Sequence, residues 1–173
     1  MNAQEIMLGS RVAHVRELKT EIAKLKAENA ALRDETAALH AHFDLALLAA
    51  DDLRRLPADG VLVLVDGWNR ILGADRVAAN PEELIARAKR RLEERPHDVV
   101  WIVFDGPRES VRNEGRLRVS YTGGTGPHRA DRFICDYLRM ARYAGSLMRL
   151  AVETSDKDFR ATVRRLAPEV TFV

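Results

Sequence analysis

Short, uninterrupted runs of apolar residues recur from Val61 onward, and they constrain the fold of this chain more than any other feature. Val61–Val65 reads VLVLV, and Asp98–Phe104 contains VVWIVF. Strands of this kind are typical of a sheet whose two faces are both covered, as parallel sheets are. Shorter runs predict strands at Leu117–Tyr121 and Leu147–Glu153, with a last edge strand at Val170–Val173.

Helical segments alternate with these strands. Asn80 and Pro81 form a helix start, because Asn caps a helix well and Pro suits the first helical position. That helix is expected to run to about Arg95. Apolar spacing predicts two more helices, at Ala130–Tyr143 and Asp156–Leu166. The alternation predicts an α/β fold with a doubly wound, mainly parallel sheet flanked by helices.

The N-terminal region follows a different pattern, with apolar residues three, four or seven positions apart. When Ile22 is placed at position a of a heptad, leucines fill position d, whereas Asn29 and Thr36 fall at a and Arg11 falls at d. The members of this apolar seam are Leu8, Val15, Leu18, Ile22, Leu25, Leu32, Leu39, Phe43 and Ala46. The pattern predicts a long coiled-coil helix.

Leucine at d with one Asn at a favours a parallel two-stranded coil, because buried amides can pair only in register. We therefore expect a homodimer. The alternative is one long helix packed on its own domain, for which the apolar stripe is narrow. Pro57 and Gly60 end the helix. The predicted domains are a coiled-coil dimerisation helix at 1–56 and an α/β domain at 60–173.

Composition excludes several classes of protein. Hydrophobic residues make up 46% and charged residues 31% of the chain, which fits a folded domain with a charged surface. Cys135 is the only cysteine, so an internal disulfide and a Cys-based zinc cluster are excluded, and a reducing cytosol is expected. Its apolar neighbours predict a buried thiol. No apolar run approaches the roughly 20 residues of a membrane span. We expect a cytoplasmic protein without membrane contact.

Four aspartates stand where an apolar run gives way to a turn or a helix start: Asp66, Asp105, Asp131 and Asp156. The carboxyl ends of parallel strands meet at one edge of a sheet, so these side chains are expected to converge there. Two unit charges about 4 Å apart repel by roughly 4 kcal/mol at an effective dielectric of 20. A cation would relieve that repulsion, and hard oxygen ligands favour Mg²⁺ or Mn²⁺.

The same aspartates lie in four stretches that resemble, in order, the motifs of the NYN domain family. These stretches are VLVLVDGWNRI, IVFDG, RADRFI and ETSDKDF. The family belongs to the PIN-like nuclease superfamily, and the resemblance is greatest to its bacterial YacP-like members, which are linked to RNA cleavage. It covers residues 60–173. The resemblance implies a PIN-like fold and a metal-dependent endoribonuclease.

The resemblance also implies roles for individual residues. The residues that match the catalytic acids are Asp66, Asp105, Asp131 and Asp156. Of these, Asp66, Asp131 and Asp156 would bind Mg²⁺ or Mn²⁺, and such ions can turn water into a nucleophile at phosphorus. Asn69 matches the Asn of the family's motif and would contact substrate. Trp68 stands where Tyr is more common, and its ring can pack in the core or stack on a base.

Between Pro107 and Leu150 the chain is rich in arginine, which binds phosphate through a planar fork. The arginines expected to contact RNA are Arg108, Arg129, Arg132, Arg139 and Arg142. The spacing of the last three places them on one helix face. The alternative is an ordinary solvated surface. The Gly-rich loop 122–128 lacks the ending of a P-loop and is expected to be a connector or lid in which His128 either touches substrate or has no role.

Other functions stay open at this stage. A catalytically inactive NYN-type module that binds RNA or a ribosomal partner shares every feature above except metal binding. A phosphotransfer domain fits less well, because a haloacid-dehalogenase-like phosphatase needs a second Asp at the position of Trp68. A receiver domain usually has adjacent acids after its first strand, and this chain has none there.

Overall fold

The computed structural model describes residues 3–145 and 147–173, with side chains from His14 onward. The residues form two compact units, Met1–Phe43 and Asp44–Val173. One long helix, α1 (Ala3–Arg55), supplies the first unit and the opening segment of the second. The α/β unit therefore begins earlier in the sequence than Pro57 and Gly60 suggest.

In the first unit the apolar seam of α1 is exposed to solvent. Its described valine, isoleucine, leucine and phenylalanine side chains are 48–63% exposed, from Val15 to Phe43. The side chains of Leu8 and Arg11 lie outside the described residues. A long helix is confirmed, whereas its pairing with a second copy stays a prediction. No helix in the described part of the chain is long and apolar enough to cross a membrane.

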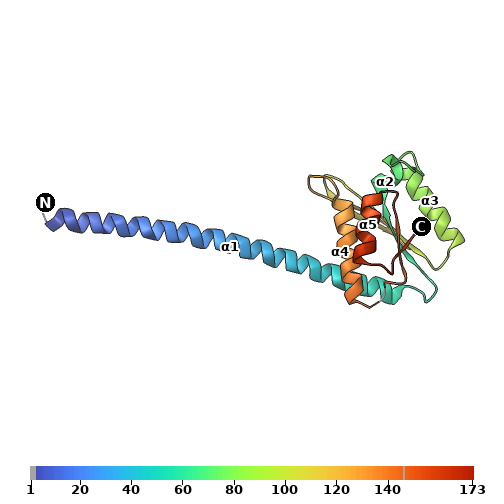
Figure 1. Cartoon of the computed structure of the whole chain (residues 1–173), viewed down its shortest axis with the longest axis horizontal. Helices are drawn as coiled ribbons and strands as arrows, with labels where there is room; N and C mark the ends of the chain where they lie inside the picture. The colour runs from blue at the N-terminus through green and yellow to red at the C-terminus, as the bar shows by residue number, and fades with distance from the viewer. Residues whose placement is uncertain (1–2, 146) are drawn as a thin grey trace. The chain divides into compact units, whose positions relative to one another are not determined.

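The second unit is built on a six-stranded sheet in the order β3-β4-β2-β1-β5-β6 (Figure 1). The strands are β1 (Leu62–Asp66), β2 (Val99–Phe104), β3 (Glu109–Glu114), β4 (Leu117–Thr122), β5 (Leu150–Glu153) and β6 (Thr171–Phe172). All neighbouring strands are parallel except β3 and β4, which form an antiparallel hairpin. The expected α/β fold with a mainly parallel sheet is thus confirmed.

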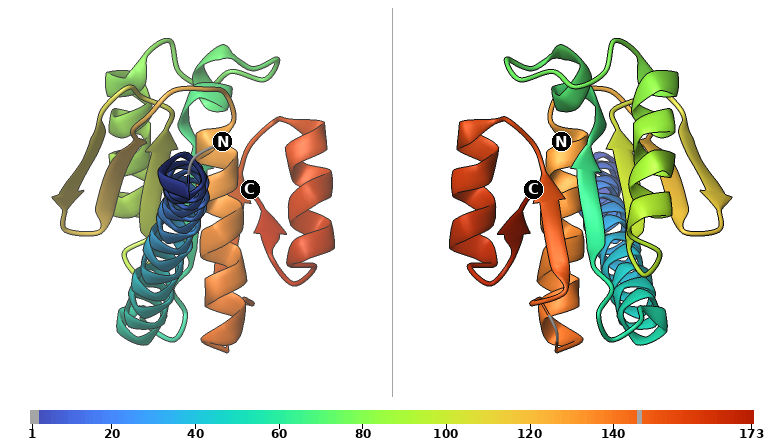
Figure 2. Two further views of the ribbon diagram at one scale, coloured as in Figure 1. Left: turned by 90° about the vertical axis from the view of Figure 1, so that its left-hand side faces the viewer. Right: turned by 90° about the vertical axis from the view of Figure 1, so that its right-hand side faces the viewer.

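Helices cover both faces of this sheet, as Figure 2 shows. They are α2 (Gly67–Leu72), α3 (Pro81–Glu94), α4 (Arg129–Tyr143) and α5 (Lys157–Leu166). One apolar core joins the last turns of α1 with α4 and α5, and a second joins α2 and α3 to the opposite face. Alternation along β1 serves both cores, because Leu64 faces the first and Val65 the second. Cys135 is buried in the first core, as expected.

Polar contacts explain why the end of α1 belongs to the α/β unit. The Asp52 carboxylate accepts hydrogen bonds from both terminal nitrogens of Arg118, at 2.9 and 3.0 Å, and from the Tyr137 hydroxyl at 3.0 Å. Arg149 donates to the carbonyl of Leu53 at 2.7 Å and to those of Leu56 and Pro57, just beyond the helix, at 2.9 and 3.0 Å. These bonds join residues more than 60 positions apart, so they fix this segment in the tertiary structure.

The sequence did not predict two of these elements. The α2 helix has six residues, too few to show a helical period. The β3 strand, ESVRNE, is exposed apart from its partly buried last residue and carries no apolar alternation. It forms because Gly115, with a positive φ of 62°, turns the chain so that β3 can pair with β4. The strand expected from Leu147 begins at Leu150.

Candidate active site

The sheet order places a topological switch point beside β1. After β1 the chain builds β2 and β4 on one side, and it then returns to add β5 on the other side. The connections that leave β1 and β5 therefore diverge at their carboxyl ends. Ligands bind in such a crevice in open α/β sheets, because no crossover covers it.

Asp66 lies at the centre of this edge. It ends β1 and caps α2, where its Oδ1 accepts a hydrogen bond from the Asn69 amide at 3.4 Å. Its Oδ2 accepts one from the buried Thr154 hydroxyl at 3.3 Å. The next residue has to be glycine, because a Cβ on Gly67 would lie 2.3 Å from the Phe104 ring. That ring is fully buried, so the DG pair fixes how the chain leaves β1.

Asn69 ties the two divergent loops together. Its Oδ1 accepts hydrogen bonds from the Ser155 amide at 2.7 Å and the Ser155 hydroxyl at 2.8 Å. The neighbouring Thr154 hydroxyl accepts from the Asp156 amide at 3.2 Å. Asn69, expected to touch substrate, thus also positions the loop after β5. Thr154 and Ser155 are site residues that the sequence analysis missed, and their only signal is their place beside Asp156.

The other three aspartates reach the same edge from different elements. Asp156 caps α5, and its Oδ1 accepts from two amides of the first turn at 2.8 and 3.0 Å. Asp105 follows β2, and its Oδ1 accepts from the Ala130 amide at 2.6 Å. Asp131, in the first turn of α4, lies 3.1 Å from the His128 Nδ1. Three of the four acids therefore hold helix starts in place while remaining at the sheet edge.

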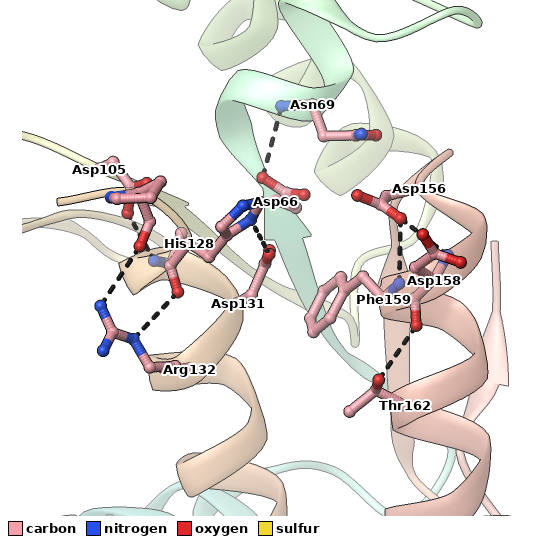
Figure 3. A network of polar contacts seen from close by, with 12 residues as sticks. Asp66, Asn69, Asp105, His128, Asp131, Arg132, Asp156, Asp158, Phe159 and Thr162 are labelled. Carbon is pink, nitrogen blue, oxygen red and sulfur yellow. Dashed lines mark hydrogen bonds and ion pairs between the residues drawn. The ribbon is translucent and has the colours of Figure 1, made fainter.

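All four carboxylates line one pocket of about 370 Å³. The remaining residues around it are Trp68, Asn69, Leu72, Gly73, Pro127, His128 and Ala130. Figure 3 shows Asp156 turned toward Asp66 from the α5 side, with Asp131 rising from α4 beside them. The predicted convergence of the aspartates is thus present in the structure. Trp68 packs edge-on against Phe104 and also forms part of the pocket wall.

Electrostatics in this pocket favour binding of positive charge. Burial raises the pKa of Asp66 to about 6, and repulsion from Asp131 and Asp156 adds to the shift. Burial also raises the pKa of Asp131, with Asp156 and Asp105 contributing, against an opposing interaction with His128. In the described part of the chain no lysine or arginine forms an ion pair with any of the four aspartates. Their negative charge is therefore balanced only by hydrogen bonds and His128.

The donor set suits Mg²⁺ or Mn²⁺ in kind, because all four side chains offer hard anionic oxygens. Among the described residues, however, no three His, Cys, Asp or Glu side chains are arranged so that they could hold one ion. The carboxylates thus share a pocket without forming a ready ligand cage. An ion would have to draw them closer together.

The predicted RNA-binding arginines are distributed unevenly around this pocket. Arg129 donates to the Gly106 carbonyl at 3.0 Å and to the Thr122 hydroxyl, while its Nη1 is buried without a described partner. Arg132 donates to the carbonyls of residues 127 and 128 in the rim. Arg108 is exposed beyond β2. Arg142 lies at the far end of α4 and donates to the Leu166 carbonyl at 3.1 Å, so it is not brought to the pocket.

Comparison with known proteins adds no relative to this chain. No protein-family model matches it, no curated protein is significantly similar, and no solved structure matches its fold closely enough. The resemblance to the NYN family therefore stays a prediction from the four sequence motifs.

Proposed function

We propose that this protein is a metal-dependent endoribonuclease of the PIN-like, NYN type. The observation that carries the proposal is the convergence of Asp66, Asp105, Asp131 and Asp156 on one pocket at the switch point, with no lysine or arginine pairing them among the described residues. The buried Asp66 and the three half-buried acids around it cost stability without cationic partners. A site that binds cations gives a reason to keep them.

In this proposal Asp66, Asp131 and Asp156 would hold Mg²⁺ or Mn²⁺, and Asp105 would complete the acidic wall. When bound, such an ion supplies an acidified water and offsets charge on the phosphate. Hydrolysis joins the hydroxyl of water to phosphorus, breaks one P–O bond of the diester and leaves the second proton on the departing oxygen. Asn69 would keep the two loops at a fixed separation while substrate binds, through its bonds to Ser155.

Arginine side chains near the pocket support RNA as the substrate. The exposed guanidinium of Arg132 lies at the start of α4, next to Asp131, whereas the half-buried Arg129 is held by Gly106 and Thr122. Arginine donors beside a site for a cation suit a polyanion, since phosphate backbones dominate nucleic-acid affinity. Arg108 adds a further positive charge on the connection after β2.

The direct test incubates purified protein with single-stranded RNA in Mg²⁺ or Mn²⁺ and follows the products by gel electrophoresis. Cleavage that EDTA abolishes is expected. RNA that is bound but never cleaved in either metal would instead favour the inactive RNA- or ribosome-binding module. Activity that persists in EDTA would exclude the metal-dependent mechanism.

We also propose that the first unit joins two copies of the chain in the cytosol. Its seam of half-exposed side chains has no described partner within the chain, and it repeats with the heptad spacing of a coiled coil. A second copy would cover the seam and allow the two Asn29 amides to pair. Analytical ultracentrifugation should report a dimer at micromolar concentration, and a monomer would contradict the proposal. Replacing Asn29 with Ile should stabilise the coil and loosen its choice of oligomer.

A further inference from the structure

A second hollow continues from the acidic pocket along the surface between α4 and α5. It encloses about 360 Å³ and shares His128, Asp131 and Asp156 with the acidic pocket. The other residues that line it are Arg132, Cys135, Arg139, Asp158, Phe159 and Thr162. Because the two hollows share three residues, a chain-like ligand can occupy both. We call this second hollow the α4–α5 groove.

One face of each helix forms the groove. On α4 its residues recur every three or four positions, from Asp131 through Cys135 to Arg139, as one helix face requires. On α5 the pair Phe159 and Thr162 follows the same rule. Cys135 and Phe159 are 6% and 5% exposed, so they form an apolar floor. The groove thus has charged walls above a floor that suits sugars or bases.

Charge changes along this groove. Asp131 and Asp156 stand at the end shared with the acidic pocket, whereas Arg139 stands at the far end, eight residues along α4. At a rise of 1.5 Å per residue this places the Arg139 Cα about 12 Å from that of Asp131 along the helix axis. Arg139 pairs with Asp136 on its own helix, yet its side chain remains exposed. It can exchange that neighbour for a phosphate.

From this geometry we infer that the α4–α5 groove carries the RNA strand away from the cleavage site, with Arg132 and Arg139 on its phosphates. The inference rests on the proposed function and adds the path of the substrate. An RNA strand fits the groove because it supplies anions at intervals to the arginines and flat apolar groups to the floor. Phosphate at the acidic end would accompany the bound cation.

The inference assigns different roles to two arginines that helical spacing had grouped as RNA contacts. Arg139 lines the groove, whereas Arg142, three residues later on the same helix, does not and instead donates to the Leu166 carbonyl. Both are exposed, and their charge is the same. Arg142→Gln is therefore a matched control for Arg139→Gln, provided that circular dichroism shows both variants folded.

The test measures binding of a fluorescent 12-nucleotide single-stranded RNA to the full-length protein by anisotropy, at several salt concentrations. Ca²⁺ replaces Mg²⁺ so that cleavage is minimised. Arg139→Gln should weaken binding roughly fivefold to tenfold. It should also reduce the salt slope by about 0.7, the value for one phosphate contact on a single strand. Arg142→Gln should keep wild-type affinity and slope.

Equal losses in Arg139→Gln and Arg142→Gln would overturn the groove assignment. Equally tight binding of a polyglutamate peptide would overturn RNA as the occupant. Groove-dependent binding by a wild-type protein that never cleaves RNA in Mg²⁺ would instead refute the proposed catalysis and leave the groove assignment intact.

Discussion

Two buried aspartates lie at opposite ends of the parallel strands, Asp98 at the amino ends and Asp66 at the carboxyl ends. The negative charges of these two side chains are balanced in different ways. Asp98, 4% exposed, precedes β2 and accepts hydrogen bonds from the Val61 amide at 3.1 Å and from Arg91 at 3.3 Å. Asp66, 5% exposed, ends β1 and has only neutral donors among the described residues. The two side chains are thus equally buried, but only Asp98 has a cationic partner among the described residues. We therefore expect Asp98 to serve stability and, under the proposed function, Asp66 to serve binding.

Replacing Asp66 with Asn should have the largest effect. The change keeps the volume and the acceptor for the Asn69 amide but removes the negative charge. Loss of an outer-shell partner of a metal site costs about 10- to 100-fold, so loss of a proposed ligand should reduce RNA cleavage at least about 100-fold. Single-turnover cleavage in Mg²⁺ measures this. If this variant cleaved RNA at the wild-type rate, Asp66 would have no role in binding that distinguishes it from Asp98.

The reciprocal change, Asp98→Asn, should harm stability and spare the site. It leaves the Arg91 guanidinium without its carboxylate, and the Nε of that group is already buried without a described partner. Breaking a buried pair costs 3–5 kcal/mol, and because Arg91 is 31% exposed we expect about 2 kcal/mol here. Urea unfolding gives the free energy. A variant that is fully stable but poorly active would reverse our assignment.

The pH dependence of stability should also distinguish the two aspartates. Because the pKa of Asp66 is raised to about 6 in the folded chain, the folded protein holds this proton more tightly than the unfolded chain does. Its stabilising contribution is present below about pH 4 and is lost as pH rises through about 6, by roughly 2–3 kcal/mol in total.

Without divalent cations, Asp66→Asn should therefore be more stable than wild type at pH 7.5. Its stability should fall less steeply between pH 4 and 6, where Asp131 still contributes. Thermal unfolding across this range provides the measurement. Adding Mg²⁺ should raise the melting temperature of wild type only, since binding to the folded state stabilises it. A stability difference between wild type and Asp66→Asn that stays constant from pH 4 to 6 would contradict the raised pKa.

Removing the first unit should have the smallest effect on the two aspartates and on the α/β unit that holds them. Deletion of residues 1–43 leaves Asp44 onward, including the core residues Leu53 and Leu56, so both ends of the parallel strands remain supported. We expect a monomer whose free energy of unfolding stays within about 0.5 kcal/mol of the α/β unit in the full chain. Sedimentation and urea unfolding test the two statements separately. Extending the deletion to residue 50 should be harmful, because Ala49 belongs to the core.

The fold could be predicted from the sequence wherever burial or capping leaves a local signal. The strand ends at Asp66 and Asp105 follow apolar runs, and Asn80 caps α3 as expected, accepting from the Glu83 amide at 2.9 Å. The α2 helix and β3 could not be predicted. Both depend on contacts made after folding, namely a cap from Asp66 and pairing with β4.

The candidate site likewise has some features that the sequence predicts and others that depend on contacts made after folding. Convergence of the aspartates follows from the rule that parallel strands end at one edge. The roles of Thr154 and Ser155 depend on the register between β1 and β5, in which Val65 lies opposite Glu153. Arg142 shows the limit of helical spacing, which groups it with Arg132 and Arg139 but does not foresee that the end of α5 accepts its hydrogen bond.

The bonds from Thr154 to Asp66 and from Ser155 to Asn69 join residues 88 and 86 positions apart. Closing so long a loop is entropically costly, so these contacts form only once β5 has docked beside β1. A ribosome makes the chain from its N-terminus, so β5 and Asp156 emerge after β1, β2 and α4. The growing chain therefore lacks an assembled acidic pocket until β5 has emerged, and its own messenger RNA is not exposed to a finished site before then.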